Sequence, residues 1–101
     1  MEKIIEGSIG LLMDLIRTQS FSKEEDKTAQ IIDTYLQNHG VKTHRELNNV
    51  WAFNKYFDSS KPTILLNSHH DTVHPNRDYT RDPFLPEIID GKLFGLGSND
   101  A

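Results

Sequence analysis

Apolar side chains recur at helical spacing over the first part of the chain. The stripe is formed by Ile5, Ile9, Leu12 and Ile16 and is broadened by Ile4, Leu11 and Leu15. This spacing places the apolar residues on one face of an amphipathic helix. Two glycines within the stretch lower its helical propensity without abolishing the pattern. The sequence therefore predicts a helix from about Glu2 to Arg17.

A second helix is predicted to begin after Ser22. Ser22 followed by Glu25 is a capping-box pattern, and acidic residues fill the first turn, where the helix dipole favours them. The expected buried stripe contains Ala29, Ile32, Tyr35 and Leu36. His39 is expected to close the helix, with Gly40 at the position just beyond it, where a left-handed residue is common.

The pattern then changes to that of short strands. Residues 41–47 and 50–56 alternate loosely between apolar and polar side chains, with a turn expected at Asn48 and Asn49. Residues 63–68 form a short, mostly apolar run, which is typical of a strand buried on both faces. Two helices followed by such strands predict an α/β fold with a mixed sheet.

The last third of the chain is punctuated by turn-forming residues. Residues 74–86 contain three prolines and predict a surface loop, and residues 87–94 predict a hairpin with Asp90-Gly91 as its two-residue turn. Residues 95–101 are rich in glycine and polar residues. Because such a run usually leads into another element, we expect the chain to be cut in the middle of a domain.

Composition narrows the class of protein. The 101 residues suffice for one small domain, and the net charge of −4 comes without a basic tract, so nucleic acid and anionic membranes are not expected partners. The absence of cysteine excludes a disulfide scaffold and a cysteine-based zinc finger, and it fits a cytoplasmic location. Neither a signal peptide nor an apolar run long enough to span a bilayer is visible.

Candidate chemistry follows the predicted buried strand. In an extended chain residues two apart point the same way, so His69 and Asp71 should share one side and His70 should face the other. A carboxylate beside an imidazole can fix the tautomer of a metal-bound histidine. The alternative is a chance triplet in which Asp71 caps a turn.

The other histidines carry little functional signal. His70 and His74 could be surface residues, while His39 and His44 suit a helix end and a strand face. A second candidate site is the glycine-rich run that ends at Asp100, because its backbone can turn sharply and present one carboxylate. The alternative there is a flexible loop with an ordinary surface aspartate. The run is not a phosphate loop, since it lacks the third glycine and the Gly-Lys pair.

Three blocks, in order and at characteristic spacing, carry a resemblance to a known family. They are residues 65–75, residues 79–86 and residues 90–100. Together they resemble the co-catalytic zinc hydrolases, which include acetylornithine deacetylase, succinyl-diaminopimelate desuccinylase, aminoacylase-1 and carboxypeptidase G2. The wording of the first and third blocks looks closest to acetylornithine deacetylase of arginine biosynthesis.

The resemblance implies a fold and a set of roles. Residues 1–101 would be the N-terminal portion of an α/β/α catalytic domain, truncated at the bridging-aspartate motif. His69 resembles the histidine ligand of one zinc, Asp71 the catalytic-site aspartate that orients this histidine, and Asp100 the aspartate that bridges both zincs. The peptide bond after Asp100 is usually cis in the family. The general-base glutamate and the remaining ligands would lie beyond Ala101.

The function implied is hydrolysis of the amide bond of a small N-acyl amino acid at two zinc ions, for which cobalt can substitute. A chain that holds only one terminal and one bridging ligand is expected to be inactive and to bind zinc poorly. A di- or tripeptidase of the same family and a non-catalytic α/β interaction module are the alternatives. An incomplete sheet would leave an open edge, so we also expect self-association into a homo-oligomer.

Overall fold

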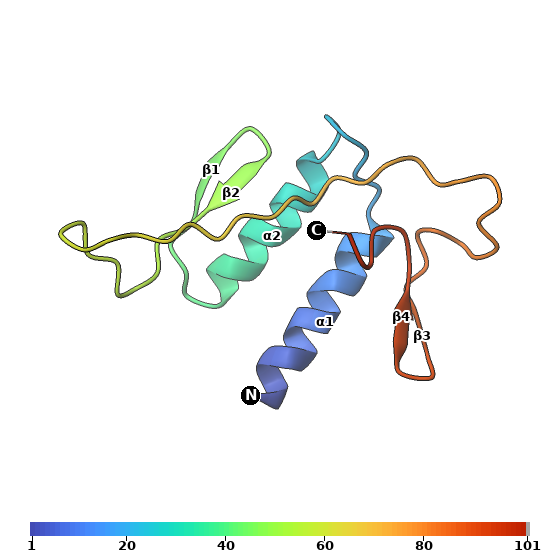
Figure 1. The fold of residues 1–101 in the computed structure, drawn as a ribbon, viewed down its shortest axis with the longest axis horizontal. Coiled ribbons are helices and arrows are strands. Elements are labelled where there is room, and N and C mark those ends of the chain that lie inside the picture. The colour runs from blue at the N-terminus through green and yellow to red at the C-terminus, as the bar shows by residue number, and fades with distance from the viewer. Residues whose placement is uncertain (101) are drawn as a thin grey trace.

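The computed structural model describes residues 1–100 as two helices beneath a long extended segment, with a hairpin on either side (Figure 1). The class is α/β, as predicted. Neither helix is long and apolar enough to cross a membrane in the part of the chain described. The elements in chain order are α1 (Glu2–Arg17), α2 (Asp26–Asn38), β1 (His44–Glu46), β2 (Asn49–Trp51), β3 (Glu87–Ile89) and β4 (Lys92–Phe94).

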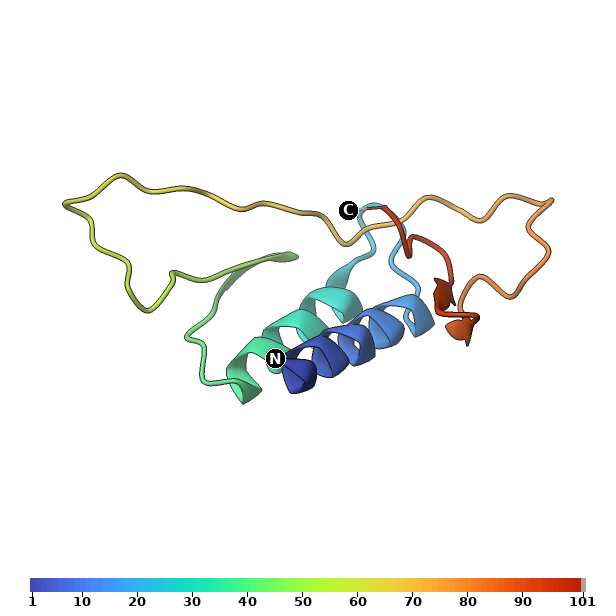
Figure 2. The same ribbon diagram turned by 60° about the horizontal axis from the view of Figure 1, so that its bottom comes forward.

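The two helices lie side by side and run in opposite directions (Figures 1 and 2). Helix α1 has the predicted bounds, and its buried anchor is Ile16, which is 4% exposed. Ala29 of α2 is fully buried. At the other end of α1 the apolar stripe is uncovered, and Ile4 and Ile5 are 68% and 51% exposed. The predicted helix is therefore correct, but only its C-terminal half is packed into a core.

Helix α2 begins differently from the prediction. Its N-cap is Glu25, no side chain caps it, and the hydroxyl of Ser22 donates to Asp71 instead of to the helix. The Glu25 carboxylate accepts hydrogen bonds from the Lys23 amide at 3.0 Å and the Asn48 side chain at 3.2 Å. The capping box was therefore a wrong prediction, because a distant carboxylate competes for the serine. The end of the helix is as predicted, with His39 as C-cap and Gly40 at φ +76°.

Both hairpins are antiparallel pairs of three-residue strands. In the β1–β2 pair Glu46 is opposite Asn49, so the turn residues are Leu47 and Asn48, one position earlier than predicted. In the β3–β4 pair Ile89 is opposite Lys92, which confirms the Asp90-Gly91 turn. Both turn residues have positive φ, +52° and +73°, as a type I′ turn requires.

The predicted buried strand over residues 63–68 is not formed. The side chains of Ile64, Leu65 and Leu66 are 86%, 83% and 90% exposed. A buried strand needs partners on both edges and cover on both faces, and within residues 1–100 no strand pairs with this segment. Figure 2 shows it as an extended chain that passes over the helices.

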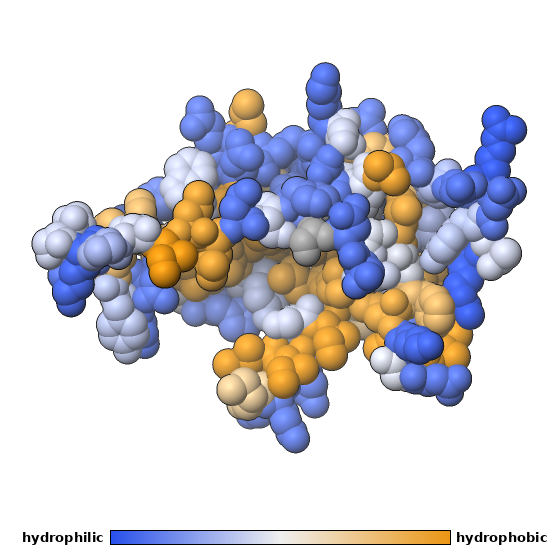
Figure 3. Space-filling model, in the orientation of Figure 1, coloured by the Kyte–Doolittle hydropathy of each residue, from blue (hydrophilic) through white to orange (hydrophobic). Residues whose placement is uncertain are grey.

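The expected mixed sheet is consequently absent from the described residues. The two hairpins form separate two-stranded sheets, and the parallel pairing is a single bridge between Phe21 and Thr72. Apolar side chains remain on the surface over the start of α1, the β3–β4 hairpin and the extended segment (Figure 3). Residues 74–86 contain no helix or strand, in agreement with the predicted loop.

Candidate metal centre

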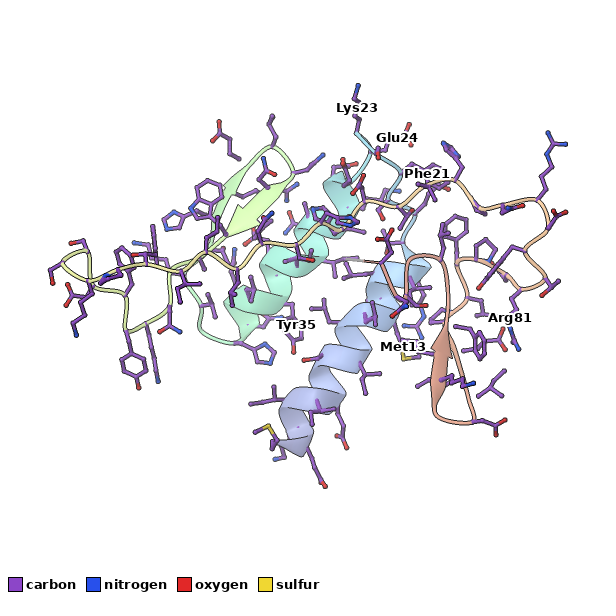
Figure 4. The ribbon with its side chains drawn as sticks, in the orientation of Figure 1. Met13, Phe21, Lys23, Glu24, Tyr35 and Arg81 are labelled. Carbon is purple, nitrogen blue, oxygen red and sulfur yellow. The ribbon has the colours of Figure 1, made fainter. Side chains whose placement is uncertain are left out.

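The extended segment is attached to the loop between the helices by two hydrogen bonds. The Thr72 amide donates to the carbonyl of Ser20 at 2.8 Å, and the Ser20 hydroxyl donates to the carbonyl of His70 at 2.9 Å. Ser20 is 2% exposed, so both bonds are shielded from water. Figure 4 shows the loop at the labels Phe21, Lys23 and Glu24, beside the extended segment. This attachment fixes where the residues from His69 to Thr72 lie.

His70 faces the helices and anchors the extended segment to them. Its Nδ1 lies 2.7 Å from the hydroxyl of Thr28, which is fully buried, and its Nε2 lies 3.0 Å from the carbonyl of Asn48. The suggestion that His70 is a surface residue is therefore wrong. His74 is exposed and packs against Phe21 in a tilted arrangement, with ring centroids 3.9 Å apart.

His69 and Asp71 point to the opposite side, as the alternation predicted. His69 Nδ1 lies 3.0 Å from Asp71 Oδ1, and His69 Nε2 lies 3.6 Å from Asp100 Oδ1. The imidazole therefore stands between two carboxylates that are 29 residues apart in the sequence. The His69 side chain is 50% exposed, so its ring remains accessible from solvent.

The glycine-rich run brings Asp100 to this position. Gly97 has φ +76°, and the Asp100 amide donates to its carbonyl at 3.1 Å, so the chain turns tightly there. A Cβ at Gly97 would lie 2.9 Å from Thr72 Cγ2, which shows how closely the run approaches the extended segment. The Leu96 amide donates to the carbonyl of Pro83 at 2.8 Å. The three motif blocks thus meet in space.

The Asp71 carboxylate is stabilised in its ionised form. The Ser22 hydroxyl lowers the pKa of Asp71, partial burial opposes this, and His69 lowers the pKa further through a hydrogen bond and its charge. Both carboxylate oxygens are occupied, Oδ1 by His69 and Oδ2 by Ser22. An ionised acceptor at Oδ1 favours a proton on His69 Nδ1 and leaves Nε2 with a free lone pair.

An open groove of about 750 Å³ lies between the helices and the extended segment. Its walls are apolar along the helices, where Leu12, Leu15 and Leu36 line it, and polar at the end formed by His69 and Asp100. A mostly apolar groove with a few polar groups at one end is the usual form of a small-molecule site.

The donor set fits one part of a zinc site. Imidazole nitrogen and carboxylate oxygen are both zinc ligands, and the carboxylate of Asp71 supplies the usual support for a ligating histidine. Within residues 1–100 no group of three histidine, cysteine or acidic side chains is arranged to hold a metal. His69 and Asp100 would hold zinc only together with further ligands. The expected cis bond joins Asp100 to Ala101 and lies outside the described residues.

Several residues around the site were not predicted to contribute to it. Ser22 was assigned to a helix cap and Asn48 to a turn, and no role was assigned to Ser20 or Thr28. Each acts on a partner between 22 and 50 residues away in the sequence. Periodicity and capping patterns detect only local pairs, so no signal in the sequence identified these contacts.

Together the fold and site define a class, an α/β chain that presents a carboxylate-supported histidine opposite a second carboxylate. Comparison with known proteins sharpens this description. No family model matches the chain. The chain is 33% identical over 101 residues to succinyl-diaminopimelate desuccinylase 2 of Ruegeria sp. (strain TM1040), a match covering 91% of the chain and 25% of the relative.

Two further relatives carry the same name. Succinyl-diaminopimelate desuccinylase of Psychromonas ingrahamii is 31% identical over 98 residues, covering 91% of the chain and 25% of the relative. The desuccinylase of Rickettsia felis is 33% identical over 101 residues, covering 91% of the chain and 26% of the relative. The chain thus spans about a quarter of the length of the curated relatives it matches.

This similarity agrees with the resemblance carried by the three motif blocks, because succinyl-diaminopimelate desuccinylase is one of the hydrolases that the blocks resemble. It does not support the finer placement closest to acetylornithine deacetylase, because the relatives are desuccinylases. The residues of two short motifs did not distinguish between these two branches of the family.

Proposed function

We propose that the protein containing this chain is a zinc-dependent amidohydrolase that cleaves N-acyl amino acids, and that residues 1–101 are part of its catalytic domain. The observation that carries the proposal is the position of His69, which is supported by Asp71 on one nitrogen and faces Asp100 with the other. The similarity to desuccinylases over 91% of the chain favours hydrolysis over a non-catalytic interaction module.

Each residue then has a defined task. Asp71 keeps the proton of His69 on Nδ1, so that Nε2 would be free to bind a metal, and Asp100 would supply a carboxylate ligand on the same side. The chemistry that zinc would supply there is polarisation of the scissile carbonyl and activation of a water molecule for attack. Because Asp71 and Asp100, the carboxylates beside His69, are already assigned to orienting and holding groups, we expect the general base that deprotonates this water to lie elsewhere in the protein.

The acyl group is proposed to be succinyl. The similar proteins are succinyl-diaminopimelate desuccinylases, which favours an N-succinyl amino acid over N-acetylornithine and over a dipeptide. The test is to express the complete protein with zinc and to compare kcat/KM for succinyl-diaminopimelate, N-acetylornithine and a series of dipeptides. The highest kcat/KM with an N-acetyl substrate would refute the succinyl assignment, and the highest with dipeptides would favour the peptidase alternative.

The assignment of ligands is tested by substitution in the complete protein. His69→Ala is expected to abolish tight binding of one zinc and the activity with it. Asp71→Asn is expected to cost about 10–100-fold in zinc affinity, the usual range for loss of a partner behind a ligand. His44→Ala is the matched control, because His44 stacks on Trp51 in the β1–β2 hairpin. Unchanged zinc content in His69→Ala would refute the assigned site.

The chain of 101 residues by itself is expected to be inactive and to bind zinc weakly, since it would supply only two ligands. Calorimetric titration with zinc measures this directly. A tight complex with one or two zinc ions per chain would contradict the expectation.

A further inference from the structure

The loop at residues 20–22 lies alongside residues 70–72, where a single parallel bridge joins Phe21 to Thr72. The register is set by the main chain, through the bridge between Phe21 and Thr72 and the Thr72 amide bond to Ser20. The buried hydroxyl of Ser20 reinforces it on the His70 carbonyl. None of these contacts involves the side chain of Ser22.

The Ser22 side chain instead reaches the functional face of the extended segment. Its hydroxyl donates to Asp71 Oδ2, while Asp71 Oδ1 lies 3.0 Å from His69 Nδ1. A carboxylate can rotate about its bond to Cβ, and the bond at Oδ2 selects the rotation in which Oδ1 faces the imidazole. Two consecutive hydrogen bonds therefore connect Ser22, in the interhelical loop, through Asp71 to the His69 ring, whose other nitrogen faces Asp100.

We propose that Ser22 is a positioning residue that holds the Asp71 carboxylate against His69 Nδ1, so that His69 keeps Nε2 free on the side of Asp100. The role in metal binding rests on the proposed function, but the positioning itself is a property of this chain. Ser22 does not cap α2 and is solvent-exposed, so helix formation and core packing do not depend on it.

The test uses the complete protein, freed of metal, at mildly alkaline pH. Long-range proton–nitrogen spectra report which nitrogen of His69 carries the proton. Ser22→Ala is expected to shift the ratio of Nδ1–H to Nε2–H tautomers toward Nε2–H by about 2- to 10-fold, the effect of one hydrogen bond of ordinary strength. Ser22→Thr keeps a hydroxyl and is expected to restore the wild-type ratio.

Two measurements separate positioning from a structural role. The hydrogen exchange of the Thr72 amide reports the parallel pairing and is expected to be unchanged in Ser22→Ala. Ser60→Ala is the matched control, because its hydroxyl donates to Asp58 at 2.7 Å in another loop, and it should leave the His69 ratio unchanged. An unshifted ratio in Ser22→Ala, or a shift accompanied by faster exchange at Thr72, would overturn the proposal.

Failure of the proposed function has a different signature. If the tautomer ratio responds to Ser22 but the complete protein neither binds zinc through His69 nor hydrolyses N-acyl amino acids, the positioning stands and the enzyme assignment falls. If the complete protein is an active zinc enzyme and the ratio does not respond, the enzyme assignment stands and the role of Ser22 falls.

Discussion

His70 and His69 are neighbours in the sequence with opposite surroundings. His70 lies between Thr28 and the carbonyl of Asn48, whereas His69 faces two carboxylates and solvent. The extended backbone separates the two rings, and the bonds of His70 to α2 and the β1–β2 turn decide which ring faces inward. His70, which faces the helices, thus orients His69, which faces solvent.

This anchoring predicts a loss of stability in Thr28→Val. The change removes the hydroxyl beside His70 Nδ1 at a fully buried position, so the free energy of unfolding should fall by about 1–3 kcal/mol. Thr34→Val on the exposed face of α2 is the control, with an expected effect within about 0.5 kcal/mol. Urea denaturation of the three proteins measures the difference, and equal midpoints would contradict the anchor.

Asp33 makes a second link between α2 and the segment that follows it. The hydroxyl of Thr43 and the side chain of Gln37 donate to its carboxylate, and these bonds, chiefly that of Thr43, hold the pKa of Asp33 below its ordinary value of 3.8. A carboxylate with a lower pKa in the folded state stabilises the fold above its unfolded pKa. That contribution is lost as the pH falls through the folded pKa.

Asp33→Asn is therefore expected to be less stable than wild type at neutral pH, with a difference that shrinks as the pH falls below 3.8 and vanishes below the lower pKa of the folded state. Denaturation midpoints of both proteins at neutral and acidic pH measure this. A difference that persists unchanged at acidic pH would show that the charge of Asp33 is not the cause.

At the scale of elements, the glycine-rich run is packed against the end of α1. A Cβ at Gly95 would lie 2.5 Å from Ile16 Cγ2, and Ile16 is the buried anchor of that helix. The absence of a side chain at Gly95 lets the run that carries Asp100 lie on α1. Helix packing and the placement of the second carboxylate are therefore coupled.

Gly95→Ala is expected to lower the free energy of unfolding by about 1–3 kcal/mol, because the added methyl group overpacks the contact with Ile16. Gly10→Ala is the matched control within α1, where a Cβ meets no atom within 4 Å. There the better helix former should raise stability by about 0.5–1 kcal/mol. Thermal or urea denaturation distinguishes the two signs, and a stabilising Gly95→Ala would refute the close contact.

For the whole molecule, the dominant feature is apolar surface that the described residues leave uncovered. Ile64, Leu65 and Leu66 are each more than four-fifths exposed on an extended segment, and further apolar side chains lie over α1 and the β3–β4 hairpin (Figure 3). An unpaired, apolar extended segment is a template for pairing with another chain. This arrangement supports the expectation of self-association.

Leu65→Lys should weaken that association, since a charge on an open edge opposes pairing. Light scattering over a range of concentrations is expected to show oligomers of wild type and a shift toward monomer in the variant. Ser60→Lys, in the neighbouring loop, controls for the added charge. Monomeric wild type at high concentration would contradict the expectation.

How much could be predicted from the sequence depends on how local each feature is. The bounds of α1, the end of α2 at His39-Gly40 and the Asp90-Gly91 turn follow from nearest neighbours, and the structure has them. The alternation that separates His69 and Asp71 from His70 is also local. The strand expected over residues 63–68 failed because strands need partners, which an apolar run cannot supply by itself.

The sequence by itself thus determined the bounds of α1, the end of α2, the Asp90-Gly91 turn and the resemblance that the residues around His69, Asp71 and Asp100 carry. Only the tertiary structure decided that Ser22 serves Asp71 rather than a helix, and that Thr28 and Asn48 hold His70. It also decided that Asp100 lies opposite His69. The physical reason is that propensities and periodicity act between neighbours in sequence, whereas a site is built from hydrogen bonds between segments that only folding brings together.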